Sequence, residues 1–187
     1  SGPDKETPDL QFHVQPVSLD KFGEPVHRFP AITASVCNWR PESRGSVHVR
    51  SPDFALQPAI APNYLSQERD REIAVRAIRL ARTIAKQPSF ARYAPQEHKP
   101  GNQFETDEDL VRAAGDIGTT IFHPVSTCRM GADPDSVVDP QLRLRALKRL
   151  RVADASIMPT ITSGNTNSPT IMIAEKAAQM ILADHKG

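Results

Sequence analysis

Cysteine is scarce in this sequence. Cys37 and Cys128 are its two cysteines, and neither belongs to a CxxC motif or to a cluster of cysteine and histidine. A disulfide framework and a cysteine-based zinc site are therefore excluded. Cys128, which has no evident base or metal partner in the sequence, is expected to be a small buried hydrophobic side chain.

The sequence also lacks an excess of charge and a long apolar run. Its 23 lysines and arginines nearly balance its 22 acidic residues, for a net charge of +1, so no general field attracts nucleic acid or an anionic membrane. No run approaches the roughly 20 apolar residues that cross a bilayer, and the first residues do not form a signal peptide. We expect no nucleic-acid partner, no transmembrane segment and a soluble, cytoplasmic protein.

Proline, by contrast, is abundant. The chain has 17 prolines and 9 glycines, which indicate many loops, and its hydrophobic fraction of 39% is somewhat low, which suggests a surface that meets something else. Apolar and polar residues alternate over residues 10–15 and 46–50, and residues 32–39 are rich in strand-forming types. These three segments predict antiparallel strands with one covered face.

The middle of the chain has helical patterns. A helix is expected over residues 67–86, with Ser66 as its cap and with Glu68 and Asp70 in the first turn, where the helix dipole favours negative charge. A second helix is expected to begin at Thr106, which starts a capping-box pattern. The apolar face of the first helix is predicted from residues at helical spacing: Ala74, Ala77, Ile78, Ala81, Ile84 and Ala85.

Two polar residues in the last third follow strand-like segments. Residues 119–122 predict a short strand that delivers His123, and Pro124 forces His123 into an extended conformation. Residues 142–147 and 150–153 predict two further β segments, the second of which ends in Asp154. Taken alone, such a histidine is more often structural than catalytic, and Asp154 is equally compatible with a ligand contact and with a capping role.

Residues 163–170, SGNTNSPT, predict a shaped loop that leads into a final helix. Pro169 suits the first helical position and Ser168 suits the cap. The N-terminus of such a helix attracts anions or electron-rich ligand edges. Asn165 and Asn167 stand beside this end, either as turn residues or as ligand contacts.

These motifs carry a family resemblance. Residues 119–181, TTIFHPVSTCRMGADPDSVVDPQLRLRALKRLRVADASIMPTITSGNTNSPTIMIAEKAAQMI, resemble the C-terminal signature of the glucose-methanol-choline (GMC) oxidoreductases, closest to their choline-dehydrogenase-like branch. Residues 9–16, DLQFHVQP, and 40–70, RPESRGSVHVRSPDFALQPAIAPNYLSQERD, resemble the substrate-domain part of the same family. The resemblance therefore covers nearly the whole chain.

The resemblance implies a role for individual residues. His123 in HPVST matches the family's active-site histidine, and Asn167 in GNTNSPT matches the second member of the catalytic pair, so Asn165 is expected to shape the loop. Asp154 and Ala155 match a segment that lies against FAD, and the helix start, Asn167, Ser168, Pro169 and Thr170, matches the part that approaches the flavin. Ser126 stands where the family commonly has glycine, which bears on the backbone geometry beside His123, although a serine can occupy an extended conformation.

The implied reaction is the oxidation of a small primary alcohol, choline-like or other, to the aldehyde. The base takes the hydroxyl proton while hydride passes to flavin N5, and a donor stabilises the developing alkoxide. The GxGxxG motif with which the family binds FAD is absent from these 187 residues. The implied partner is thus an N-terminal FAD-binding half, on the same or a separate chain.

The expected fold class is α+β, with an antiparallel sheet covered on one side by helices. Residues 1–118 are expected to form a substrate-binding-type domain, and residues 119–187 a segment that completes an FAD domain. Two alternatives remain: a non-catalytic packing module, and a lyase of the same family without net redox change. The sequence also leaves open which alcohol reacts, and whether the enzyme is an oxidase or a dehydrogenase, because pocket residues lie partly in the absent half.

Overall fold

The computed structural model describes residues 1–3, 5–21 and 23–185, and it divides into two compact units. Unit 1 comprises residues 1–44 and 63–118, and unit 2 comprises residues 45–62 and the chain from Thr119 onward. The expected division after residue 118 is thus one of the limits between the units, whereas residues 45–62 group with the C-terminal part. The assignment of these parts to substrate and FAD domains stays a prediction.

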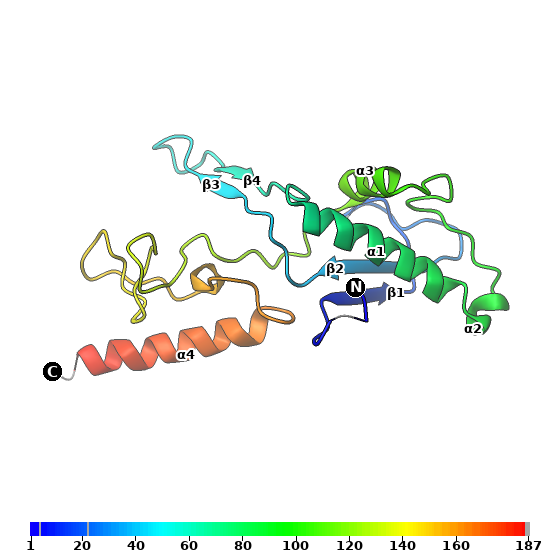
Figure 1. Cartoon of the computed structure of the whole chain (residues 1–187). Coiled ribbons are helices and arrows are strands. Elements are labelled where there is room, and N and C mark those ends of the chain that lie inside the picture. The colour runs from blue at the N-terminus through cyan, green and yellow to red at the C-terminus, as the bar shows by residue number, and fades with distance from the viewer. Residues whose placement is uncertain (4, 22, 186–187) are drawn as a thin grey trace. The chain divides into compact units, whose positions relative to one another are not determined.

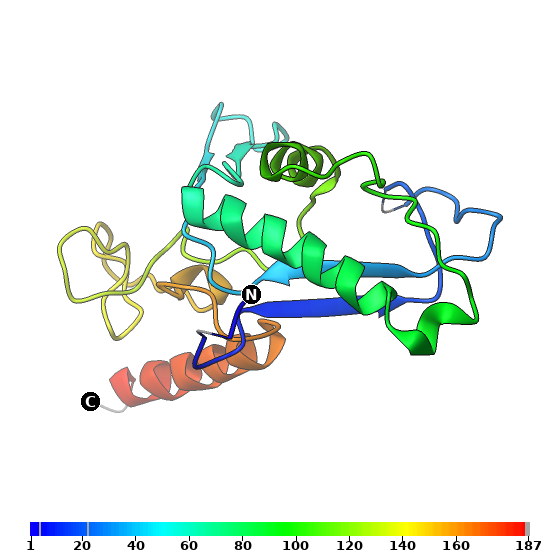
Figure 2. The same cartoon turned by 45° about the vertical axis from the view of Figure 1, so that its right-hand side comes forward.

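Unit 1 is built on a two-stranded antiparallel sheet. Strand β1 (Leu10–Gln15) pairs with β2 (Thr33–Asn38), so that Leu10 lies opposite Asn38 and Gln15 lies opposite Thr33. The alternating pattern correctly predicted β1, and the content of strand-forming residues correctly predicted β2. Helix α1 (Glu68–Ala85) lies between this sheet and helix α3 (Asp107–Ile117), and the short helix α2 (Pro88–Ala91) follows it (Figures 1 and 2).

Helix α1 buries residues on two sides. Ile73 and Ala77 are buried, and so is Val75, which lies on the opposite side of the helix at about 100° per residue. The single apolar face predicted from the sequence is therefore wrong in part, and Ile84 is exposed. A helix with neighbours on two sides, the sheet and α3, has two faces to cover.

Of the two helix caps predicted in unit 1, one is correct. The Thr106 hydroxyl accepts a hydrogen bond from the Asp109 backbone N–H at 3.1 Å and so caps α3. Ser66 does not cap α1, because the N-cap residue is Gln67, which makes no side-chain cap. The backbone N–H of Gln67 donates a hydrogen bond to the Ser43 hydroxyl at 3.3 Å.

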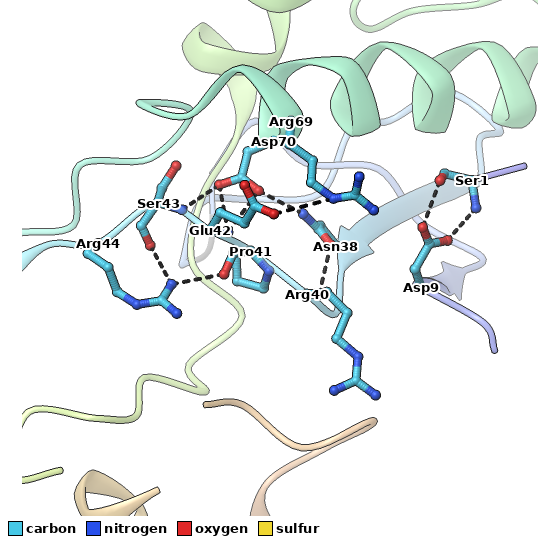
Figure 3. A network of polar contacts seen from close by, with 10 residues as sticks. All are labelled: Ser1, Asp9, Asn38, Arg40, Pro41, Glu42, Ser43, Arg44, Arg69 and Asp70. Atoms are coloured by element: carbon cyan, nitrogen blue, oxygen red, sulfur yellow. Dashed lines mark hydrogen bonds and ion pairs between the residues drawn. The ribbon is translucent and has the colours of Figure 1, made fainter. Parts of the chain in front are cut away.

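Asp70 joins α1 to the segment that follows β2 (Figure 3). Its carboxylate is buried and accepts hydrogen bonds from the backbone N–H of Glu42 at 3.0 Å, from that of Ser43 at 2.7 Å and from the Asn38 amide at 3.2 Å. Burial raises the pKa of Asp70, but hydrogen bonds from Ser43 and Glu42 outweigh it, and the pKa lies below its ordinary value. The charged carboxylate therefore fastens this segment to the helix.

Unit 2 is organised around its C-terminal helix. Strand β3 (Ser46–His48) pairs antiparallel with β4 (Ala59–Ala61), and a 3-10 turn, η1 (Ala155–Ile157), packs against helix α4 (Asn167–Asp184). Ile173 and Ala177 lie on one face of α4 because they are four residues apart. The hydrophobic core of the unit consists of Val138, Leu142, Ile157, Met158, Ile173 and Ala177.

The three strands predicted in the last third of the chain are absent from this described region. Residues 119–122 are irregular, and Phe122 has φ 64°, in the left-handed region that interrupts extended backbone. Residues 142–147 and 150–153 form only isolated bridges, such as Arg143 with Arg151. Left-handed residues at Leu142 and Arg149 break these segments as well.

The fold class is α+β, as expected, but the sheet is divided into two small antiparallel pairs instead of one larger sheet. Among the described residues, no helix combines the length and the apolar content that a membrane-spanning segment requires.

Candidate active site

His123 lies in a loop of unit 2, between the left-handed Phe122 and Pro124, and is half-buried. The expectation that a strand delivers it is wrong. Two residues of the α4 loop hold its ring instead. The hydroxyl of Thr166 lies 2.8 Å from Nδ1, and the amide nitrogen of Asn165 lies 2.9 Å from Nε2.

These two contacts select one tautomer of the imidazole. An amide nitrogen can only donate, so Nε2 of His123 accepts the hydrogen bond from Asn165. A neutral imidazole then carries its proton on Nδ1, which donates to the Thr166 hydroxyl. Nε2 is therefore the basic nitrogen of the ring, and it points toward a polar, exposed side chain.

Thr166 is fixed by the helix that it precedes. It is the N-cap residue of α4 and is only 7% exposed. Its carbonyl accepts hydrogen bonds from the backbone N–H of Thr170 at 3.0 Å and from the Thr170 hydroxyl at 2.6 Å. Because its side chain is turned to His123, it does not cap α4. The hydroxyl thus holds the histidine, and the first N–H groups of the helix lack a side-chain cap.

Ser126 anchors the segment that follows His123. Its backbone has φ 74°, in the left-handed region that favours glycine, so this serine is not extended. A non-glycine residue costs about 1–2 kcal/mol there. The Ser126 hydroxyl donates to the carbonyl of Met158 at 2.7 Å and lies 3.0 Å from that of Pro159, and these bonds offset the strain.

The start of α4 differs in detail from the sequence prediction. The helix begins at Asn167, so Ser168 is not its cap and Pro169 is its third residue, not its first. Asn167 and Ser168 are exposed, whereas Pro169 and Thr170 are half-buried. Asn167 is not among the partners of the His123 ring; Asn165, expected only to shape the loop, is one of them.

Asp154 caps η1. Its Oδ1 accepts a hydrogen bond from the Ser156 backbone N–H at 2.8 Å and another from the Ser156 hydroxyl at 2.5 Å. The capping role considered from the sequence is therefore present, and the side chain remains exposed. Ala155 is half-buried and packs against the core of the unit, beside α4.

Cys128 is half-buried, which falls short of the full burial expected of it.

The sequence prediction gave Asn165 only a loop-shaping part and did not single out Thr166, and these are the two residues whose side chains contact the His123 ring. A threonine just before an apolar helical pattern is a typical N-cap residue, so Thr166 could have been identified as the first fixed position of the loop. Its contact with a histidine 43 residues away has no signal in a single sequence.

The comparisons with known proteins agree with one another. Residues 41–174 match the family model described as GMC oxidoreductase. An alcohol dehydrogenase (acceptor) of Pseudomonas putida is 43% identical over 182 residues, which are 97% of this chain and 33% of that protein. An oxygen-dependent choline dehydrogenase of Chromohalobacter salexigens is 41% identical over 181 residues, 97% of this chain and 32% of that protein.

Solved structures give the same result. Pyridoxine 4-oxidase from Mesorbium loti aligns with a TM-score of 0.77 and 36% identity, over 87% of this chain and 31% of that one. A formate oxidase of Aspergillus oryzae, from work on its FAD modification, aligns with a TM-score of 0.80 and 31% identity, over 89% of this chain and 30% of its own. The chain spans about a third of the length of the curated relatives that it matches.

Proposed function

Because this chain belongs to the GMC oxidoreductase family, we propose that it is the C-terminal part of an FAD-dependent enzyme that oxidises a primary alcohol to the aldehyde. FAD, when bound, supplies the acceptor for the hydride of the alcohol's α-carbon. The chain itself supplies a base, a hydrogen-bond donor and a helix end. The observation that carries this proposal is the histidine held by two side chains of the α4 loop.

His123 acts as the base through Nε2. Its Nδ1 proton is engaged by Thr166, so the other nitrogen is free to take a proton from a substrate hydroxyl that replaces the Asn165 amide. A base within hydrogen-bonding reach of the proton that it removes contributes roughly 10² to 10⁴ in rate. The ring is also kept from turning, because both of its nitrogens have a partner.

Asn165 acts as the donor to the developing alkoxide. Its amide nitrogen lies 2.9 Å from the basic nitrogen, so an oxygen that gives its proton to Nε2 would be within reach of the same amide. The family resemblance favours Asn167 for this part instead. Asn167 is exposed at the first helical position. We propose that its backbone N–H, and not its side-chain amide, faces the flavin.

The start of α4 fits one edge of a flavin. Asn167 and Ser168 are exposed, the N-cap side chain does not cover their N–H groups, and the 18 residues of α4 give this end a partial positive charge. Pro169 has no N–H, and the Thr170 hydroxyl already donates to Thr166, so these two residues would contribute contacts only. Asp154 and Ala155, on η1, are the further residues proposed to hold FAD.

The outer face of α4 supports a missing partner within the enzyme. Ile171, Met172 and Leu182 are each more than half exposed, at 56%, 55% and 60%. Apolar side chains that gather on one helix favour burial against another part of a protein. The proposed cover is an N-terminal FAD-binding half, which would lie in the two thirds of the relatives' length that this chain does not span.

The test is to produce this chain together with a polypeptide that supplies the N-terminal two thirds of the fold. We expect a yellow complex in which a primary alcohol bleaches the flavin under anaerobic conditions. His123→Ala should lower kcat by about 10² to 10⁴ while the flavin content stays unchanged. His48→Ala, an exposed histidine of unit 2, is the matched control.

Each other outcome points elsewhere. Normal turnover by His123→Ala would remove the histidine from the mechanism. A yellow complex that no alcohol bleaches would favour a lyase. A well-folded complex without flavin would leave the chain as a packing module.

A further inference from the structure

A second cluster of polar side chains lies in unit 1, apart from His123. Asp20 and His27 belong to the connection between β1 and β2, and His98 belongs to the connection between α2 and α3. Each offers one ligand atom, and the three atoms lie within 4.8 Å of one another. The cluster therefore joins two loops that are about 70 residues apart in the sequence.

His27 is oriented by hydrogen bonds at both of its ring nitrogens. Nδ1 lies 3.1 Å from the Ser18 hydroxyl, and Nε2 lies 3.2 Å from Oδ2 of Asp20. With its proton on Nε2, a neutral imidazole donates to Asp20 and accepts from the Ser18 hydroxyl. With its proton on Nδ1, it donates to Ser18, and the lone pair of Nε2 and the Asp20 oxygen then face each other as two ligand atoms for a cation.

Asp20 is prepared to act as an anionic ligand. Its Oδ1 is paired with the ammonium group of Lys99, whereas Oδ2 faces the imidazole. The carboxylate thus has one oxygen that Lys99 does not use.

The aromatic neighbour Phe29 packs on a face of the His27 ring. Phe29 stacks on His27 with ring centroids 4.9 Å apart and planes inclined by 21°, so it covers a face of the imidazole and not its edge. His98 meets His27 at 5.2 Å and 80°. Metal ions bind imidazole in the ring plane, which the stacked Phe29 does not occupy.

We propose that Asp20, His27 and His98 form a binding site for a divalent transition-metal ion of the zinc type. Two imidazoles and one carboxylate are a donor set that zinc takes in proteins, with water in the remaining position. Ser18 and Lys99 support the ligands from behind, as hydrogen-bonded partners of metal ligands commonly do. The bound ion ties the β1–β2 connection to the α2–α3 connection and stabilises unit 1.

The competing explanation is a metal-free cluster held by the Asp20–Lys99 ion pair, a proton and aromatic packing. To separate the two, the untagged chain is treated with EDTA, dialysed and titrated with Co²⁺, whose visible absorption reports nitrogen and oxygen ligands. Zn²⁺ is then added as competitor. We expect one equivalent of Co²⁺ to bind and Zn²⁺ to displace it.

Variants locate the bound ion. His27→Ala and His98→Ala should each weaken Co²⁺ binding at least about tenfold, and Ser18→Ala about tenfold through the lost support of the ligand. His48→Ala leaves one exposed histidine fewer and should not change the affinity. Phe29→Leu removes the ring stack but no ligand, so it should bind the ion normally.

The fold of each variant is checked by circular dichroism before titration. Co²⁺ affinity that is equal in wild type, His27→Ala and His98→Ala would overturn the proposal and leave adventitious binding by surface side chains. Failure of the wild-type chain to bind Co²⁺ would likewise overturn the proposal and leave the packed metal-free cluster. If His27→Ala does not fold, Asp20→Asn, at an exposed position, gives the same readout.

Discussion

The hydroxyl of Thr166, the residue that starts α4, lies 2.8 Å from Nδ1 of His123, which is 43 positions earlier in the chain. This contact connects the helix to the ring that we propose as the base. Since the threonine is only 7% exposed, its hydroxyl has little freedom to point elsewhere. Thr166 is therefore a positioning residue, which acts on the substrate through the histidine.

Replacement of Thr166 should separate this positioning role from folding. Thr166→Val keeps the shape but removes the partner of Nδ1, and we expect kcat of the complete enzyme to fall about tenfold, which corresponds to a lost hydrogen bond of about 1.4 kcal/mol. Thr166→Ser should restore most of it. The pH profile of kcat is measured alongside, because a change in stability alone would leave the profile in place.

The two candidate donors to the alkoxide, Asn165 and Asn167, can be distinguished by their alanine variants. Asn165→Ala should lower kcat by about 10², as loss of an alkoxide-stabilising donor does in other enzymes. Asn167→Ala should retain kcat within about tenfold and weaken flavin binding by a comparable factor at most. Steady-state kinetics and flavin titration of both variants decide between them. The reverse pattern would restore the assignment that the GNTNSPT motif favours.

Asp70 should make the stability of the chain depend on pH. Because its folded-state pKa lies below 3.8, its contribution is fully present above that pH and is lost as the pH falls through the lower folded-state value. Asp70→Ala, which leaves the N–H groups of Glu42 and Ser43 without their acceptor, should cost about 3 kcal/mol at pH 7. Urea unfolding at pH 7 and at pH 3 measures both effects.

A matched variant controls for the loss of a charge on α1. Glu72 is an exposed acid of the same helix, and Glu72→Ala should change the unfolding free energy by less than about 0.5 kcal/mol. If the difference between wild type and Asp70→Ala is as large at pH 3 as at pH 7, the carboxylate charge is not what fastens the segment.

Ser126 offers a test of strain against hydrogen bonding. Ser126→Ala keeps a side chain at φ 74° and removes the bond to the Met158 carbonyl, so it should destabilise the chain by about 1–2 kcal/mol. Ser126→Gly also loses the bond but relieves the left-handed residue, and it should remain within about 0.5 kcal/mol of wild type. Thermal unfolding of the pair is sufficient. Equal destabilisation by both would show that the backbone strain is negligible.

Local signals in the sequence predicted the regular elements well. The alternation around Phe12 and the capping pattern at Thr106 depend on neighbours within a few residues, and the structure confirms the elements that they predict. The strand expected before His123 is absent, because the short β-rich run of residues 119–122 has no partner strand in the described part of the chain. Apolar pattern alone does not supply such a partner.

A sequence motif predicts His123 as a site residue, but no motif predicts which side chains surround its ring. Asn165 and Thr166 reach it across 42 and 43 residues. Three consecutive polar residues, 165–167, look alike in a sequence, and the helix start decides which of them face the ring. The cluster of Asp20, His27 and His98 escaped notice for the same reason.

The position of Thr166 at the start of α4 has a consequence for evolution of the chain. The helix buries Ile173 and Ala177 in the core, so its rotation about its own axis is fixed. A single residue inserted between Thr166 and Ile173 would rotate one relative to the other by about 100° and move the helix start by about 1.5 Å. The hydroxyl would then turn away from His123. Insertions before residue 165 do not change the rotation of Thr166 relative to Ile173. Natural variation in chain length should therefore accumulate there.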